Sequence, residues 1–78
     1  MKRTFDITFN GDESFQTEPM TKTAVIDLCW DTLVQNNMQD DGYLIGCYEG
    51  EEYTLIASVS RRRRANGRVS CKIINFKN

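Results

Sequence analysis

The sequence contains no histidine, one proline, one tryptophan and, from Ser58 onward, no acidic residue. Histidine is the commonest general base and a common metal ligand, so its absence removes the most frequent catalytic apparatus. No serine or cysteine lies in a motif that activates a nucleophile, and no glycine-rich loop suited to phosphate binding is present. We therefore expect a protein that is not an enzyme and that carries no cofactor.

Long hydrophobic runs are also absent. No stretch approaches the ~20 apolar residues of a membrane-spanning helix, and residues 1–10 lack the apolar stretch of a secretory signal. Cys29, Cys47 and Cys71 are odd in number, widely spaced and set among apolar residues, which favours reduced core thiols over a disulfide framework. The sequence thus predicts a cytoplasmic protein. Residues 40–41 alone do not make a calcium loop, so we expect no metal.

What the sequence does have is an uneven distribution of charge. Residues 1–57 hold three basic and eleven acidic residues, whereas residues 58–78 hold seven basic and no acidic ones. The formal net charge of −1 therefore conceals segments of −8 and +7. Clustered cations repel one another, and an anionic partner relieves that repulsion. The candidate anion-binding residues are Arg61, Arg62, Arg63, Arg64, Arg68 and Lys72.

The N-terminal part predicts a hairpin and a helix. Residues 4–9 alternate strictly between apolar and polar side chains, and a turn signal at 10–12 leads to a short second strand at 14–17. A three-residue loop would place Ile7 opposite Phe15. Residues 20–38 follow with apolar side chains at helical spacing, after a start marked by the proline at position 19.

Three strand-like runs follow the helix, at 43–48, 53–62 and 68–76, and the segments 49–51 and 65–67 suit tight hairpins. We expect one small α+β domain over residues 1–78. It comprises an N-terminal β-hairpin, one amphipathic helix packed on a mainly antiparallel sheet, and a C-terminal three-stranded meander in the order ββαβββ.

Three-residue loops in the meander would pair Ile45 with Leu55 and Cys47 with Tyr53. This register predicts that one face of the sheet is buried. The members of that face are Tyr43, Ile45, Cys47, Leu55, Ala57, Val59, Cys71 and Ile73. The other face would then carry aromatic and apolar side chains suited to stacking or to an interface. These are Tyr48, Ile56, Ile74 and Phe76.

Two functions remain open from the residues alone. The first is a non-enzymatic binding module whose basic hairpin engages nucleic acid or a nucleoprotein complex. The second is a small protein-binding inhibitor or adaptor, of the compact kind that mobile elements encode, acting through the apolar sheet face or through acidic loops. The acidic candidates are Asp40, Asp41, Glu49, Glu51 and Glu52. Pairing of acidic and basic halves in a homodimer is a third arrangement.

Overall fold

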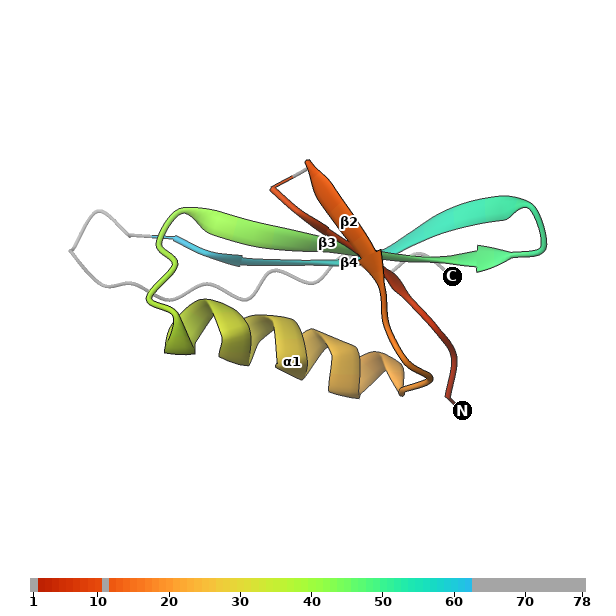
Figure 1. Ribbon diagram of the computed structural model, residues 1–78, viewed down its shortest axis with the longest axis horizontal. Coiled ribbons are helices and arrows are strands. Elements are labelled where there is room, and N and C mark those ends of the chain that lie inside the picture. Colours follow the sequence, from red (N-terminus) through yellow and green to blue (C-terminus); the bar gives the residue numbers. More distant parts are fainter. Residues whose placement is uncertain (1, 11, 63–78) are drawn as a thin grey trace.

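One helix packs on a four-stranded antiparallel sheet in the computed structural model, which describes residues 2–10 and 12–62 (Figure 1). The strands lie in the order β2-β1-β3-β4. The elements are β1 (Asp6–Phe9), β2 (Glu13–Gln16), α1 (Lys22–Gln35), β3 (Asp41–Glu49) and β4 (Glu52–Arg61). The predicted α+β class is confirmed, whereas the predicted strand at 68–76 lies outside the described residues.

The N-terminal hairpin has the predicted register. Ile7 lies opposite Phe15, and Phe9 lies opposite Glu13 across a three-residue loop. Asn10 opens this loop with a φ of 49°, a left-handed conformation that asparagine tolerates better than most residues. On its other side β1 pairs with β3, so that Ile7 also lies opposite Ile45. The hairpin therefore joins the sheet through β1.

The helix is shorter than predicted at both ends. It begins at Lys22 rather than at residue 20, and the side chain of Thr21 caps it by accepting a hydrogen bond from the amide of Ala24 at 3.2 Å. Residue 20 is instead held in an extended segment, because Met20 exchanges two backbone hydrogen bonds with Arg3. At the other end the helix stops at Gln35 and is capped by the next residue.

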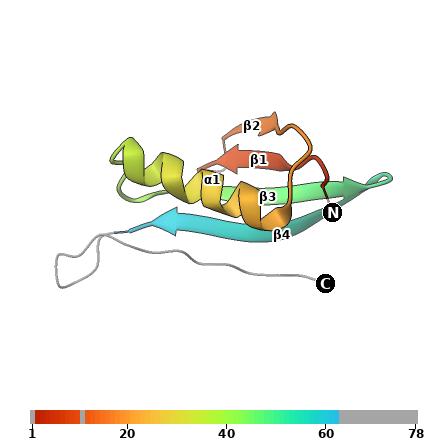
Figure 2. The ribbon, with the colours of Figure 1, turned by 90° about the horizontal axis from the view of Figure 1, so that it is seen from below.

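The core lies between α1 and one face of the sheet, mainly that of β3 and β4 (Figures 1 and 2). The helix buries Val25, Ile26, Cys29 and Leu33. These residues lie on one side of the helix, as its apolar periodicity predicts. The buried apolar residues are Phe5, Ile7, Val25, Ile26, Cys29, Leu33, Tyr43, Ile45, Cys47, Ile56, Ala57 and Val59. Trp30 is partly buried at the edge of this cluster.

The register between β3 and β4 differs from the prediction. The turn has two residues, not three, so that Glu49 lies opposite Glu52 and Tyr48 opposite Tyr53. A β-bulge at Ile56 then shifts the pairing by one residue. Beyond the bulge, Ala57 and Val59 face the core as predicted.

Candidate functional site: the outer face of the sheet

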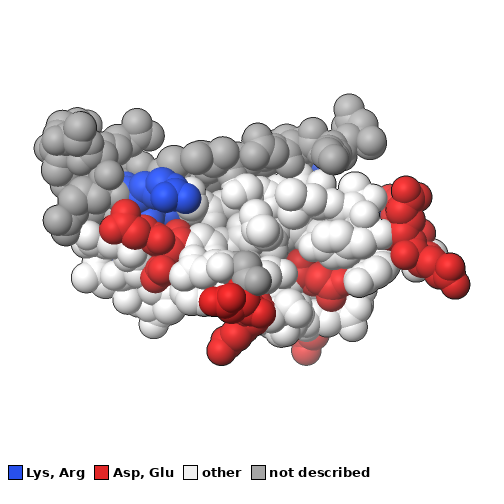
Figure 3. Space-filling view, turned by 90° about the horizontal axis from the view of Figure 1, so that it is seen from above, with Lys and Arg blue, Asp and Glu red and all other residues white. Residues whose placement is uncertain are grey.

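The face of the sheet that points away from α1 is here called the outer face. On β3 the outward positions are Gly42, Leu44, Gly46 and Tyr48, alternating with the buried core residues. Leu44 is 39% exposed and Tyr48 is 61% exposed. Figure 3 looks onto this face: uncharged side chains cover most of its middle, and acidic groups lie among them, along one edge and at both ends, one of which is the β3–β4 turn. The outer face therefore presents apolar and aromatic groups to solvent.

The two-residue turn brings two tyrosines together on the outer face. Tyr48 lies directly opposite Tyr53, and their ring centroids are 5.2 Å apart in an edge-to-face arrangement with planes at 63°. Aromatic rings favour this geometry because the positive edge of one meets the negative face of the other. We call Tyr48 and Tyr53 the aromatic pair. Tyr53 remains 43% exposed, so the pair is available to a partner.

Gly46 provides the space for the second ring of this pair. A Cβ atom at Gly46 would come within 2.7 Å of Cε2 of Tyr53 and closer still to its Cζ and hydroxyl. The ring of Tyr53 therefore lies on the bare backbone of β3. This partial burial, together with the nearby carboxylate of Asp6, raises the pKa of the Tyr53 hydroxyl.

A hollow of about 570 Å³ lies beside the aromatic pair and is here called the aromatic hollow. Its walls include Asp6 and Thr8 of β1 and Leu44 of β3, as well as both tyrosines. Asp6 lies directly opposite Gly46 in the β1–β3 pairing, and Gly46 lies beneath the ring of Tyr53. The hollow therefore combines two aromatic rings with one carboxylate.

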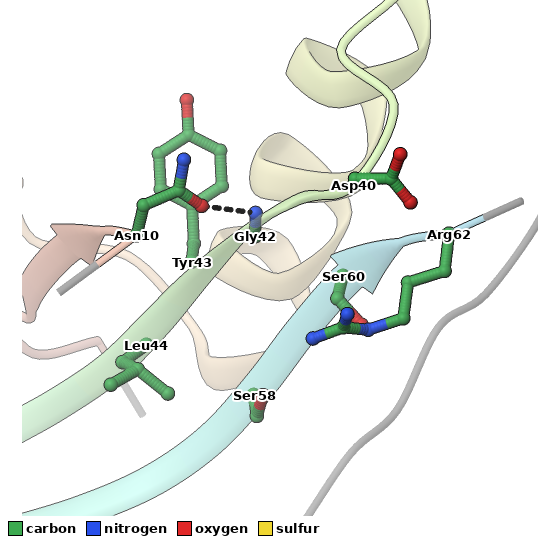
Figure 4. Close-up of a pocket in the computed structure, with 8 residues that line it drawn as sticks. All are labelled: Asn10, Asp40, Gly42, Tyr43, Leu44, Ser58, Ser60 and Arg62. Carbon is green, nitrogen blue, oxygen red and sulfur yellow. Dashed lines mark hydrogen bonds between the residues drawn. The ribbon is translucent and has the colours of Figure 1, made fainter.

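A second hollow, of about 350 Å³, lies on the other side of Leu44 (Figure 4). Its walls include Gly42, Ser58, Ser60 and Arg62, so it is here called the polar hollow. The side chain of Arg62 extends toward Ser60 in Figure 4. Leu44 borders both hollows, so they lie on either side of this residue on the outer face.

The asparagine of the β1–β2 loop fixes one wall of the polar hollow. The side-chain oxygen of Asn10 accepts a hydrogen bond from the amide of Gly42 at 2.9 Å (Figure 4). Its side-chain nitrogen donates to the carboxylate of Asp41 at 2.7 Å. The loop is thereby tied to the first residues of β3.

The two described arginines of the predicted basic hairpin lie on opposite sides of the sheet. Arg61 donates to the backbone carbonyl of Leu33 at 3.2 Å and to the side chain of Asn37 at 3.3 Å, so its guanidinium caps the C-terminus of α1. Arg62 is exposed on the outer face. The other predicted basic residues, Arg63, Arg64, Arg68 and Lys72, lie outside the described residues.

Of the two described residues predicted for stacking or for an interface, Tyr48 lies on the outer face and Ile56 does not. The placement of Ile56 there is wrong: this side chain is 6% exposed and belongs to the core. The two-residue turn is the cause, because it shifts the pairing near the turn by one residue. Ile56 is thereby directed inward, and Leu55, predicted as buried, lies on the wall of the aromatic hollow. Ile74 and Phe76 lie outside the described residues.

The predicted acidic residues are divided between the two ends of β3. Asp40 and Asp41 lie where the strand begins, and Glu49, Glu51 and Glu52 lie at the turn where it ends. The nine residues of the strand separate these groups by roughly 26 Å. At the turn, Glu49 faces Glu52, an unfavourable pairing of like charges that Arg3 partly offsets through an ion pair of 3.6 Å to Glu49. The structure therefore does not bring these five residues into one cluster.

The described cysteines are structural. Cys29 and Cys47 are buried and free, as predicted, whereas Cys71 lies outside the described residues. Burial raises the pKa of the Cys29 thiol to about 12, so it remains protonated near neutral pH. Arg3 donates to the sulfur of Cys47 at 3.3 Å. Within residues 2–10 and 12–62, no group of three or more cysteine, aspartate or glutamate side chains is placed to hold a metal ion.

Sequence reasoning missed Tyr53 as a surface residue. It placed this tyrosine on the buried face because it assumed a three-residue turn after Tyr48. The glycine at position 50 could have indicated the shorter turn. Gly50 has a φ of 67°, and two-residue hairpin turns require a positive φ that glycine adopts readily. A two-residue turn at Gly50 pairs the two tyrosines directly.

Comparison of the chain with protein families, with curated proteins and with solved structures finds no significant match. In the part of the chain that the structure describes, no helix has the length and apolar character needed to cross a membrane. The outer face is therefore the basis for assigning a function.

Proposed function

We propose that this protein is a non-enzymatic binding module that contacts a partner protein through the outer face of its sheet. The observation that carries the proposal is the exposure of Leu44, Tyr48 and Tyr53 together on that face. Tyrosine is enriched in protein interfaces, and charged residues are depleted at their centres. Tyr48 and Tyr53 give the outer face the aromatic part of this composition, next to Leu44.

The charges around this face favour a basic partner. Asp6 borders the aromatic hollow, and Glu51 lies in the turn beside the aromatic pair. Complementary charge speeds association and excludes partners of the same sign. We therefore expect an inhibitor or adaptor that acts on a protein with a basic contact surface. Free thiols at Cys29 and Cys47 support a reducing location, and we propose the cytoplasm.

Substituting Leu44 tests the proposal. The protein is immobilised, exposed to a nuclease-treated lysate of its source organism, and the captured proteins are quantified. Leu44→Asp should abolish capture of the specific partner, because it places a charge at the centre of the contact. Leu28→Asp is the matched control, since Leu28 is a similarly exposed leucine on α1, on the other side of the molecule. Equal capture by both variants would contradict the proposal.

Nucleic acid is the second candidate partner. One observation favours it: Arg62 is exposed on the outer face, at the start of a segment whose charged residues are all basic. Binding would be measured with short single-stranded and double-stranded DNA and RNA at two salt concentrations. If nucleic acid is the partner, affinity should fall steeply with salt and should decrease in Arg62→Gln. Binding that depends neither on salt concentration nor on Arg62 would remove this candidate.

A further inference from the structure

The aromatic hollow has the components of a receptor for an organic cation. The faces of aromatic rings carry negative potential and attract ammonium and guanidinium groups placed within about 6 Å. Tyr48 and Tyr53 both line the hollow, and the planes of their rings are inclined at 63°. Asp6 adds a full negative charge on the wall contributed by β1.

The position of this carboxylate follows from the strand register. Asp6 lies directly opposite Gly46, and the hydroxyl end of the Tyr53 ring lies over Gly46. The carboxylate and the ring are therefore neighbours, and the raised pKa of Tyr53 reflects its burial and this negative charge. Among the described residues, no side-chain hydrogen bond or ion pair engages the carboxylate of Asp6, and no basic side chain lines the aromatic hollow.

We propose that the aromatic hollow receives a lysine or arginine side chain of the partner protein, held between the aromatic pair and Asp6. This inference rests on the proposed function, because it specifies the chemistry of the partner at one point of the outer face. The hollow, at about 570 Å³, has room for a side chain of this length together with the flanking backbone. The apolar walls from Leu44 and Leu55 suit the methylene groups of such a side chain, whose charged end reaches the carboxylate.

The test uses the full chain and two short peptides. Acetyl-Gly-Arg-Gly-amide is the probe, and the same peptide with citrulline in place of arginine is its neutral counterpart of equal shape. NMR titration follows the ring protons of Tyr48 and Tyr53 and the amide of Gly46. The arginine peptide should shift these signals and bind about two- to fivefold more tightly than the citrulline peptide, as expected for an exposed cation–aromatic contact.

Two variants should remove this preference. Tyr48→Leu removes one ring, and Asp6→Asn removes the charge while keeping the size of the side chain. Their matched controls are Phe15→Leu, an exposed aromatic residue on the opposite face of the sheet, and Asp31→Asn, an exposed acidic residue of α1. Both controls should retain the preference for arginine. One-dimensional NMR spectra establish that each variant is folded.

Equal binding of the two peptides would overturn the inference, and so would a preference that survives in Tyr48→Leu. Either result leaves the proposed function standing if Leu44→Asp still abolishes capture of a partner. The opposite combination is also informative. If Leu44→Asp captures the same proteins as Leu28→Asp, the proposed function fails. The cation site would still be supported if the preference for arginine is lost in Asp6→Asn. The two failures are therefore distinguishable.

Discussion

The ring of Tyr53 lies over the backbone of Gly46 on the neighbouring strand, in the space that any larger residue at position 46 would fill with its Cβ atom. This contact fixes the ring beside Tyr48 and beside the carboxylate of Asp6. Glycine within a strand is disfavoured by about 0.5–1 kcal/mol relative to alanine. Its presence at position 46 is explained by the ring that lies on it.

Gly46→Ala should therefore alter the outer face more than the stability. The better strand propensity of alanine and the displacement of the Tyr53 ring have opposite effects, so we expect a net change in unfolding free energy below about 1 kcal/mol. In a Tyr53→Leu background, with its shorter side chain, the same substitution should be stabilising by about 0.5–1 kcal/mol. Urea denaturation of the four proteins measures both values. The same effect in both backgrounds would show that the ring does not occupy this space.

The Arg61 guanidinium stabilises the end of α1. In Arg61→Met the carbonyl of Leu33 and the side chain of Asn37 lose their hydrogen bonds from a charged donor. We expect a loss of about 1 kcal/mol in unfolding free energy. Arg62→Met is the control, since the next residue lies on the other face and should change stability by less than about 0.5 kcal/mol. Equal urea midpoints for the two variants would contradict the assignment of Arg61 as a helix cap.

The start of the helix depends on the hydroxyl of Thr21. Thr21→Ala removes the acceptor for the amide of Ala24 and should destabilise the protein by about 1 kcal/mol. Thr23→Ala, an exposed position inside the first turn, should instead leave stability unchanged or raise it by a few tenths of a kcal/mol, about the difference in helix propensity. Thermal unfolding of the two variants separates these effects. A larger loss in Thr23→Ala would place the cap elsewhere.

The buried thiol of Cys29 predicts a decline in stability at alkaline pH. Its pKa is about 12 in the folded protein and near the ordinary value of 9.0 in the unfolded chain. Between these values the unfolded chain releases the proton and the folded protein retains it, so stability falls as pH rises from 9 toward 12. Below pH 9 the contribution is fully present.

Urea midpoints between pH 8 and 11 measure this decline. Cys29→Ala removes the titrating group, so its midpoint should fall less steeply with pH than that of the original protein. Part of the decline should remain, because burial also raises the pKa values of Tyr43 and Tyr53. Identical slopes for the variant and the original protein would show that the pKa of the Cys29 thiol is the same in the folded protein and the unfolded chain.

Local patterns predicted much of the fold. A three-residue loop after the alternating first strand predicted that Ile7 lies opposite Phe15, and apolar side chains at helical spacing predicted the helix that covers the sheet. The start of the helix was wrong because Met20 pairs with Arg3, which is far away in the sequence. A capping signal cannot reveal such a pairing, since it depends on how the N-terminal segment lies against the sheet.

The candidate site was only partly predictable for a related reason. Tyr48 was placed correctly on the outer face, whereas Tyr53 was missed and Ile56 was assigned to the wrong side. Both errors come from the β3–β4 register. Side chains alternate strictly along a strand, so one inserted residue exchanges the two faces for every position on one side of it.

The sequence by itself determined that an amphipathic helix covers a sheet and that positive charge is concentrated after residue 57. Only the tertiary structure decided which side of β4 faces outward near the turn. The two-residue turn at Gly50, continued without interruption, would have turned Ala57 and Val59 away from α1. The bulge at Ile56 restores both residues to the core. The bulge leaves one residue of β4 unpaired, but burying Ala57 and Val59 beneath the helix is more favourable than regular pairing at that position.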